Sequence, residues 1–70
     1  MSNRFIHLGE YGYINVAHVV SVVYMPEEDT TQLILTNGDL VVLNQHIQIV
    51  MDVINGRAAF SLKVAKYIRH

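Results

Sequence analysis

The chain contains no cysteine, and this absence excludes two kinds of structure. No disulfide can stabilise the fold, and no thiolate can act as a nucleophile or a metal ligand. Long apolar runs are also missing: the longest have four residues, whereas a membrane-spanning helix needs about 20. The first residues lack the apolar segment of roughly 7–15 residues that marks a signal peptide. We therefore expect a cytoplasmic protein without a membrane segment.

Charged side chains are scarce as well. They make up 16% of the 70 residues, and hydrophobic residues make up 51%, whereas an average domain is about 25% charged. A chain of this length forms one small domain, residues 1–70, which buries only about 60% of the surface that its unfolded form exposes. Because so small an interior cannot hide so much apolar surface, we expect a homo-oligomer or a stable protein partner.

The few charges are distributed unevenly. Residues 1–52 contain one basic residue and six acidic residues, a net charge of 1 − 6 = −5, and residues 53–70 contain four basic residues and no acid, a net charge of +4. The four basic residues of this tail are Arg57, Lys63, Lys66 and Arg69. Such a tail is typical of a contact with nucleic acid or an acidic protein, although an ordinary solvated surface has the same composition. The sequence pI near 6.4 argues against nucleic acid, whose binding domains commonly have a pI above about 9.

The first part of the chain predicts an antiparallel β-meander of about four strands over residues 4–43. Strands are expected at Arg4–Leu8 and, strongly β-branched, at Val19–Met25, and Tyr13–Val16 is expected to be a short extended segment that leads into the second of them. Asn37-Gly38 between two apolar runs then predicts a hairpin with a two-residue type I′ turn.

A two-residue turn sets the register of this hairpin. Ile34 would oppose Val41, and Leu35 would oppose Leu40. One face would then carry Leu33, Leu35, Leu40 and Val42, and the other would carry Ile34, Val41 and Leu43. Both faces are apolar, and a single layer of helix can cover only one of them.

After Leu43 the spacing of apolar residues changes to that of a helix. Ile47, Val50, Met51 and Ile54 lie at i, i+3, i+4 and i+7, which predicts a helix over about 45–54. Asn44 is the expected N-cap, and Asn55-Gly56 the expected stop. Ile49 and Val53 widen the apolar stripe beyond what one sheet face requires. Together with the second sheet face they define the expected oligomer or partner interface: Ile34, Val41, Leu43, Ile49 and Val53.

A second, basic helix is expected over about 58–69, although alternation in Phe60–Val64 also permits an extended start. On this helix Lys63, Lys66 and Arg69 would share a surface, with Arg57 at its beginning, and would contact phosphates or an acidic partner. The expected fold class is therefore α+β, an antiparallel meander followed by one or two C-terminal amphipathic helices.

No catalytic or metal-binding pattern is present in the sequence. No pair of histidines is spaced by three or four residues, and no cysteine or carboxylate cluster accompanies them. Ser21 lies in a valine run without a nucleophile elbow, and Gly9–Gly12 lacks the spacing of a phosphate loop. We expect no enzyme activity, no catalytic residue, no metal and no cofactor.

Two stretches resemble small bacterial regulators. Phe5-Ile6-His7-Leu8-Gly9-Glu10, followed by Val19–Val23, resembles the start of the RemB family of extracellular-matrix regulatory proteins. Ile14–Val16, Leu33–Gly38 and Ile47–Met51 are similar in sequence and spacing to the FlbD/SwrD flagellar family, and the spacing is also similar to that of LytTR DNA-binding domains. The chain departs from the flagellar family in lacking its lysine-rich hairpin.

This resemblance implies a small bacterial or bacteriophage regulatory protein. The leading hypothesis is a non-catalytic interaction module that binds a protein or a complex, such as a phage-encoded inhibitor of a host system. The alternative is a DNA-binding transcriptional regulator that uses the basic C-terminal segment.

Overall fold

The computed structural model describes residues 4–70, so residues 1–3 of the expected domain lie outside the described part. The fold is α+β, and all its strands pair antiparallel. Short 3-10 turns at Gly9–Tyr11 and Val16–His18 flank β2. The elements are β1 (Phe5–His7), β2 (Tyr13–Asn15), β3 (Val19–Met25), β4 (Thr30–Leu35), β5 (Leu40–Leu43), α1 (Ile47–Ile54) and β6 (Val64–Ile68).

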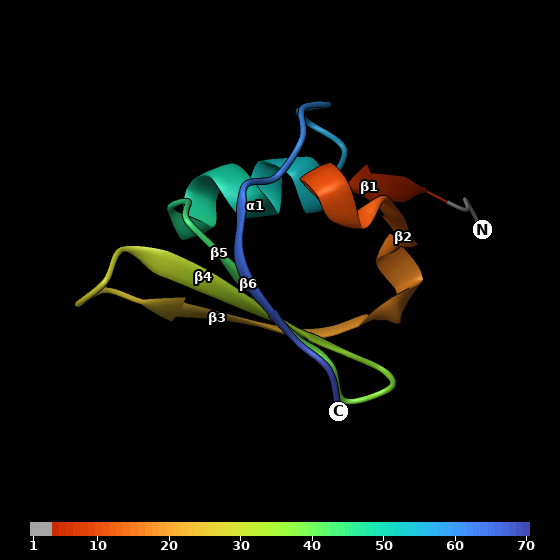
Figure 1. Cartoon of the computed structure of the whole chain (residues 1–70). Helices are drawn as coiled ribbons and strands as arrows, with labels where there is room; N and C mark the ends of the chain where they lie inside the picture. Colours follow the sequence, from red (N-terminus) through yellow and green to blue (C-terminus); the bar gives the residue numbers. More distant parts are fainter. Residues whose placement is uncertain (1–3) are drawn as a thin grey trace.

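The strands form two sheets instead of one meander. β1 and β2 pair with each other, and the four-stranded sheet has the order β3-β4-β5-β6. Helix α1 and the β1-β2 pair lie on one side of the four-stranded sheet, above it in Figure 1. We call this side the inner face and the opposite side the outer face.

The hairpin between β4 and β5 has a three-residue turn, so its predicted register was wrong. The Leu35 N–H donates to the Asp39 carbonyl at 2.9 Å, and the Gly38 N–H donates to the Leu35 carbonyl at 2.9 Å. Gly38 has a φ of 91°, whereas Asn37 is not among the residues with positive φ. This conformation is a turn closed by a glycine bulge, because a type I′ turn needs positive φ at both central residues.

The longer turn shifts the pairing by one residue. Ile34 opposes Leu40, and Leu33 opposes Val41. Since a one-residue shift moves a side chain to the other face of a sheet, the assignment of Val41 and Leu43 to an exposed face was also wrong. Both side chains are fully buried on the inner face. The core consists of Ile6, Leu8, Leu33, Leu35, Val41, Leu43, Val50, Val53 and Leu62.

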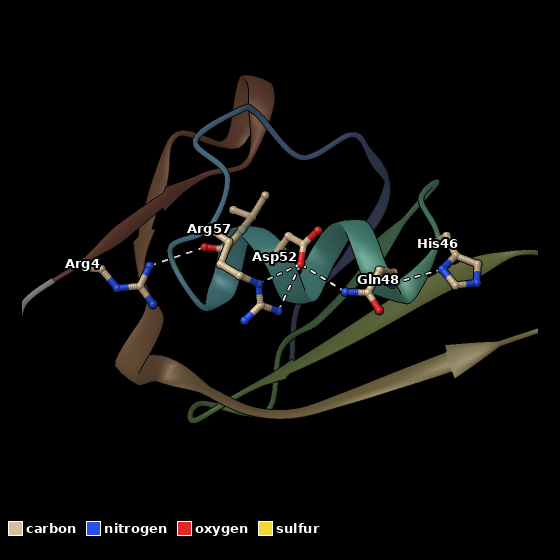
Figure 2. Close-up of polar contacts among 6 residues, drawn as sticks. Arg4, His46, Gln48, Asp52 and Arg57 are labelled. Carbon is tan, nitrogen blue, oxygen red and sulfur yellow. Dashed lines mark hydrogen bonds and ion pairs between the residues drawn. The ribbon is translucent and has the colours of Figure 1, made fainter.

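Helix α1 confirms the predicted helix, although it lies in the middle of the chain. Its N-cap is His46 and not Asn44: the Gln48 N–H donates to His46 Nδ1 at 3.0 Å (Figure 2). At the other end the Arg57 N–H donates to the Asp52 carbonyl at 2.7 Å, and Gly56 has a φ of 79°. These are the features of a Schellman motif, in which a glycine in the left-handed region ends the helix.

The chain forms strand β6 where a second helix over 58–69 was expected. Tyr67 opposes Val41, and Lys66 opposes Val42. The β-branched and aromatic residues of this segment favour a strand, and pairing with β5 satisfies backbone groups that would otherwise be unpaired. An extended start was the alternative that the alternation at Phe60–Val64 permitted, and Leu62 from this segment is buried in the core.

Candidate protein-interaction surface

The outer face of the four-stranded sheet contains two rows of side chains that cross all four strands. The register places Ser21, Ile34, Leu40 and Ile68 in the first row, and Val23, Gln32, Val42 and Lys66 in the second row. Side chains in such rows lie on the same face and contact their neighbours across the strands. Five of these eight residues are apolar, so the rows form a nearly continuous apolar surface.

Among residues 4–70, no element covers this surface. Val23, Ile34 and Ile68 are 40%, 36% and 44% exposed, and Leu40 and Val42 are half-buried. In Figure 1 no element lies on this side of the sheet. An antiparallel sheet with one face in water normally alternates apolar and polar residues. Lys66 is the only ionisable residue in the two rows.

The five residues of the predicted interface do not form one surface. Ile34 lies on the outer face and is 36% exposed. Ile49 is 39% exposed, but it belongs to α1 on the other side of the sheet. Val53 is only 4% exposed and packs in the core together with Val41 and Leu43. The sequence indicated that both sheet faces are apolar, but the wrong turn length exchanged several of their members.

The four basic residues of the tail do not share a face. Lys66 lies on the outer face, whereas the Arg69 guanidinium lies 5.3 Å from the ring centroid of Tyr67, which is on the inner side. Arg57 forms an ion pair with Asp52 at 3.0 Å. Lys63 precedes β6, and its backbone N–H donates to Gln45 Oε1 at 2.9 Å. A helix would have aligned Lys63, Lys66 and Arg69, but a strand turns successive side chains to opposite sides.

Sequence reasoning missed a shallow depression of about 450 Å³ beside β1. Its wall includes the exposed aromatic rings of Phe5, Tyr13 and Phe60. The His7 and Ser61 side chains also meet there, with Nδ1 against Oγ. These two residues are 54 positions apart, and their segments meet through the backbone bond from the Leu62 N–H to the His7 carbonyl, at 2.9 Å, and through the packing of Leu62 in the core with Ile6 and Leu8. No local motif could have shown this.

The His7–Ser61 contact does not amount to a catalytic triad. In a triad a carboxylate holds the second ring nitrogen of the histidine and stabilises its protonated form. Within residues 4–70 no carboxylate forms a hydrogen bond with His7. The ring packs instead against Tyr13, with 4.6 Å between the two centroids.

Asp39 is a polar anchor that the sequence did not indicate. Its carboxylate accepts a hydrogen bond from the Tyr67 hydroxyl at 2.8 Å and from the His70 backbone N–H at 2.9 Å. The His70 N–H and then the Tyr67 hydroxyl lower the pKa of Asp39, because both donors favour the charged carboxylate. Burial and the same contact raise the pKa of Tyr67. The carboxylate thus joins β6 to the hairpin.

Over residues 4–70 no helix has the length and apolar character needed to cross a membrane. The same residues contain no group of three or more side chains placed to hold a metal ion.

Comparisons with protein-family models, curated proteins and solved structures found no match to this chain. The resemblance to small regulators therefore stays a prediction.

Proposed function

We propose that this protein is a small, non-catalytic regulatory module that acts in the cytoplasm as a homo-oligomer and binds a protein or a protein complex through the outer face. The observation that carries the proposal is the apolar surface formed by the two rows. It places the exposed side chains of Val23, Ile34 and Ile68 on a side of the sheet that no described element covers. Contiguous exposed apolar surface of this kind marks interaction sites in small proteins.

The side chains of the two rows also indicate which surface properties the partner has. Its contact surface must be apolar, because five of the eight side chains in the rows are apolar. It must also offer a carboxylate to Lys66, since a cation buried in an interface without a partner is strongly unfavourable. A two-fold pairing of two outer faces would give Lys66 no carboxylate, because the rows contain none. This favours a different protein as the occupant of the outer face.

The structure gives no observation that favours DNA binding. That alternative placed three cations on one helix, whereas Lys66 lies on the outer face of strand β6 and Arg69 lies against Tyr67 on the inner side. We therefore propose a protein partner only. A bacterial or phage regulator, including an inhibitor of a host system, is consistent with such a module.

The test compares two exposed isoleucines. Tagged wild type, Ile34→Lys and Ile49→Lys are used to capture proteins from nuclease-treated lysate of the source cells. Ile34 and Ile49 are 36% and 39% exposed, so each variant adds one charge at a similarly accessible position. We expect one protein to bind to wild type and Ile49→Lys, and to be lost from Ile34→Lys and from Lys66→Glu.

Two results would contradict the proposal. One is equal capture by wild type and Ile34→Lys, which would place the binding surface elsewhere. The other is recovery of nucleic acid, and not protein, from lysate without nuclease. Far-UV circular dichroism of each variant shows that the fold is retained.

A further inference from the structure

The free edge of β3 contains no charge and no proline, and its one bulge, at Val20, lies outside the regular stretch Ser21–Met25. β3 is the first strand in the order β3-β4-β5-β6, and among residues 4–70 only β4 pairs with it. Its seven residues, Val19–Met25, include no charged residue and no proline. Natural proteins usually protect an exposed edge with charges, proline or a short strand. A long uncharged edge is therefore suited to pairing with another strand.

The other edge of the same sheet has the protection that β3 lacks. β6 has five residues, and Lys66 lies at its centre. If two copies paired antiparallel about the middle of β6, one Lys66 would face the other. Like charges in directly opposed positions destabilise a pair of strands. The two edges therefore differ in the property that decides whether a second copy can bind.

We infer that two copies of this chain pair antiparallel along β3, about a two-fold axis near Val23, and form one continuous eight-stranded sheet. This inference rests on the self-association proposed above and names the edge responsible. The register of β3 with β4 shifts at Val19–Ser21, so Val20 lies in a bulge. Ser21–Met25 is the regular part of the strand, and Val23 is its middle residue.

The side chains agree with this register. In a two-fold pair each contact occurs twice with the roles exchanged. Val23 would face Val23 of the second copy, and Val22 would face Tyr24. A β-branched residue opposite an aromatic residue is a favourable cross-strand pair. The acidic turn Glu27–Asp29 would lie beside the start of the other β3, where residues 15–19 contain no acid.

The pairing also extends the surface proposed for the protein partner. Val23 belongs to the second row on the outer face. Across the axis its neighbour would be the same residue of the second copy, so the rows of both copies would join. The dimer would present an apolar outer face twice as wide as that of one chain.

Because the chain contains no cysteine, any disulfide formed in a cross-linking test must come from the introduced residue. Opposed residues of an antiparallel pair have Cα atoms about 4.5–5.5 Å apart, which lies within the range of about 4.4–6.8 Å for disulfides. We expect Val23→Cys to form a covalent dimer under mild oxidation. Ser21 of one copy would oppose Met25 of the other, so a mixture of Ser21→Cys and Met25→Cys should cross-link, and each variant alone should cross-link much less. Lys66→Cys, on the protected edge, should remain uncrosslinked.

Light scattering separates this inference from the general proposal of self-association. Wild type should have twice the 8.0 kDa mass of one chain at micromolar concentration. Val23→Lys should halve this mass, since it places two cations across the axis, and Ile34→Lys should leave it unchanged. A dimer that cross-links through Lys66→Cys, or that does not cross-link through Val23→Cys, would contradict pairing along the β3 edge but not self-association itself. An 8.0 kDa monomer overturns both.

Discussion

The hydroxyl of Tyr67 donates a hydrogen bond to a carboxylate oxygen of Asp39 at 2.8 Å, across 28 positions in the chain. The other carboxylate oxygen accepts the backbone N–H of His70 at 2.9 Å. Asp39 follows the hairpin turn and is only 6% exposed. Residues 67–70 are thus attached to the hairpin by a buried carboxylate, each oxygen of which accepts a hydrogen bond.

Acidification should destabilise the fold through Asp39. Its pKa in the folded protein is below the usual value of 3.8 because of the His70 N–H and the Tyr67 hydroxyl. The stabilisation is therefore fully present above the unfolded pKa, and it is lost as the pH falls through the folded pKa. We expect the melting temperature to fall as the pH drops below about 4. Asp39→Asn should show a weaker dependence.

Circular dichroism melts between about pH 2 and pH 6 measure this effect. Glu10→Gln is the control, because Glu10 is an exposed acid outside this network. If Asp39→Asn retains the full pH dependence of wild type, another carboxylate is responsible.

Removal of the Tyr67 hydroxyl should lower stability at neutral pH. Tyr67→Phe keeps the ring against the core but leaves one oxygen of a buried carboxylate without its donor, which is unfavourable. We expect the melting temperature to fall by several degrees. Tyr13→Phe is the matched control, since Tyr13 is 69% exposed and should change little. Equal effects of the two variants would show that the bond to Asp39 does not stabilise the fold.

A side chain at Gly38 should be unfavourable for two separable reasons. Its φ of 91° strains any other residue, and an added Cβ would lie 2.9 Å from Cγ of His70. We expect Gly38→Ala to destabilise by about 1 kcal/mol or more. The double variant Gly38→Ala with His70→Ala should recover the part that comes from the clash. Denaturant titrations of the four proteins in this cycle give the coupling, and a coupling of zero would show that His70 moves aside freely.

Neighbouring residues of β5 should respond very differently to truncation. Leu43 is fully buried on the inner face, and Val42 lies half-buried on the outer face. Leu43→Ala should lower the free energy of unfolding by about 2–5 kcal/mol because it leaves a cavity, and Val42→Ala by less than about 1 kcal/mol. Urea titrations measure both. The register predicted from a two-residue turn would give the opposite order.

Much of the fold could be predicted because the periodicity of its elements is strong. The β-branched run at Val19–Met25 and the helical spacing of Ile47, Val50 and Ile54 each indicate one element, and the structure confirms both. The separate pairing of β1 with β2 could not be predicted, since the residues between elements do not determine which strands pair. The same holds for the meeting of His7 and Ser61, which depends on long-range packing.

Two local features could not be predicted from the sequence alone: the length of the hairpin turn and the conformation of residues 64–68. Asn37-Gly38 is compatible with a two-residue turn and with a three-residue turn that ends in a glycine, and only the second places Leu33 and Val41 on one face. Residues 64–68 fit either a helix or a strand, and pairing with β5 decides between them. As a result, the sequence indicated that both sheet faces are apolar but assigned several residues of the hairpin to the wrong face.

The late position of β6 has a consequence for how the chain folds during synthesis. When residues up to Ile54 have left the ribosome, five strands and the helix are present, but β5 still lacks its second neighbour and Leu62 is missing from the core. The nascent chain therefore exposes the backbone of β5 and an incomplete interior until Val64–Ile68 has been made. Because a strand edge in this state can pair with another nascent chain, the interval before β6 docks is the period in which misassembly competes with folding.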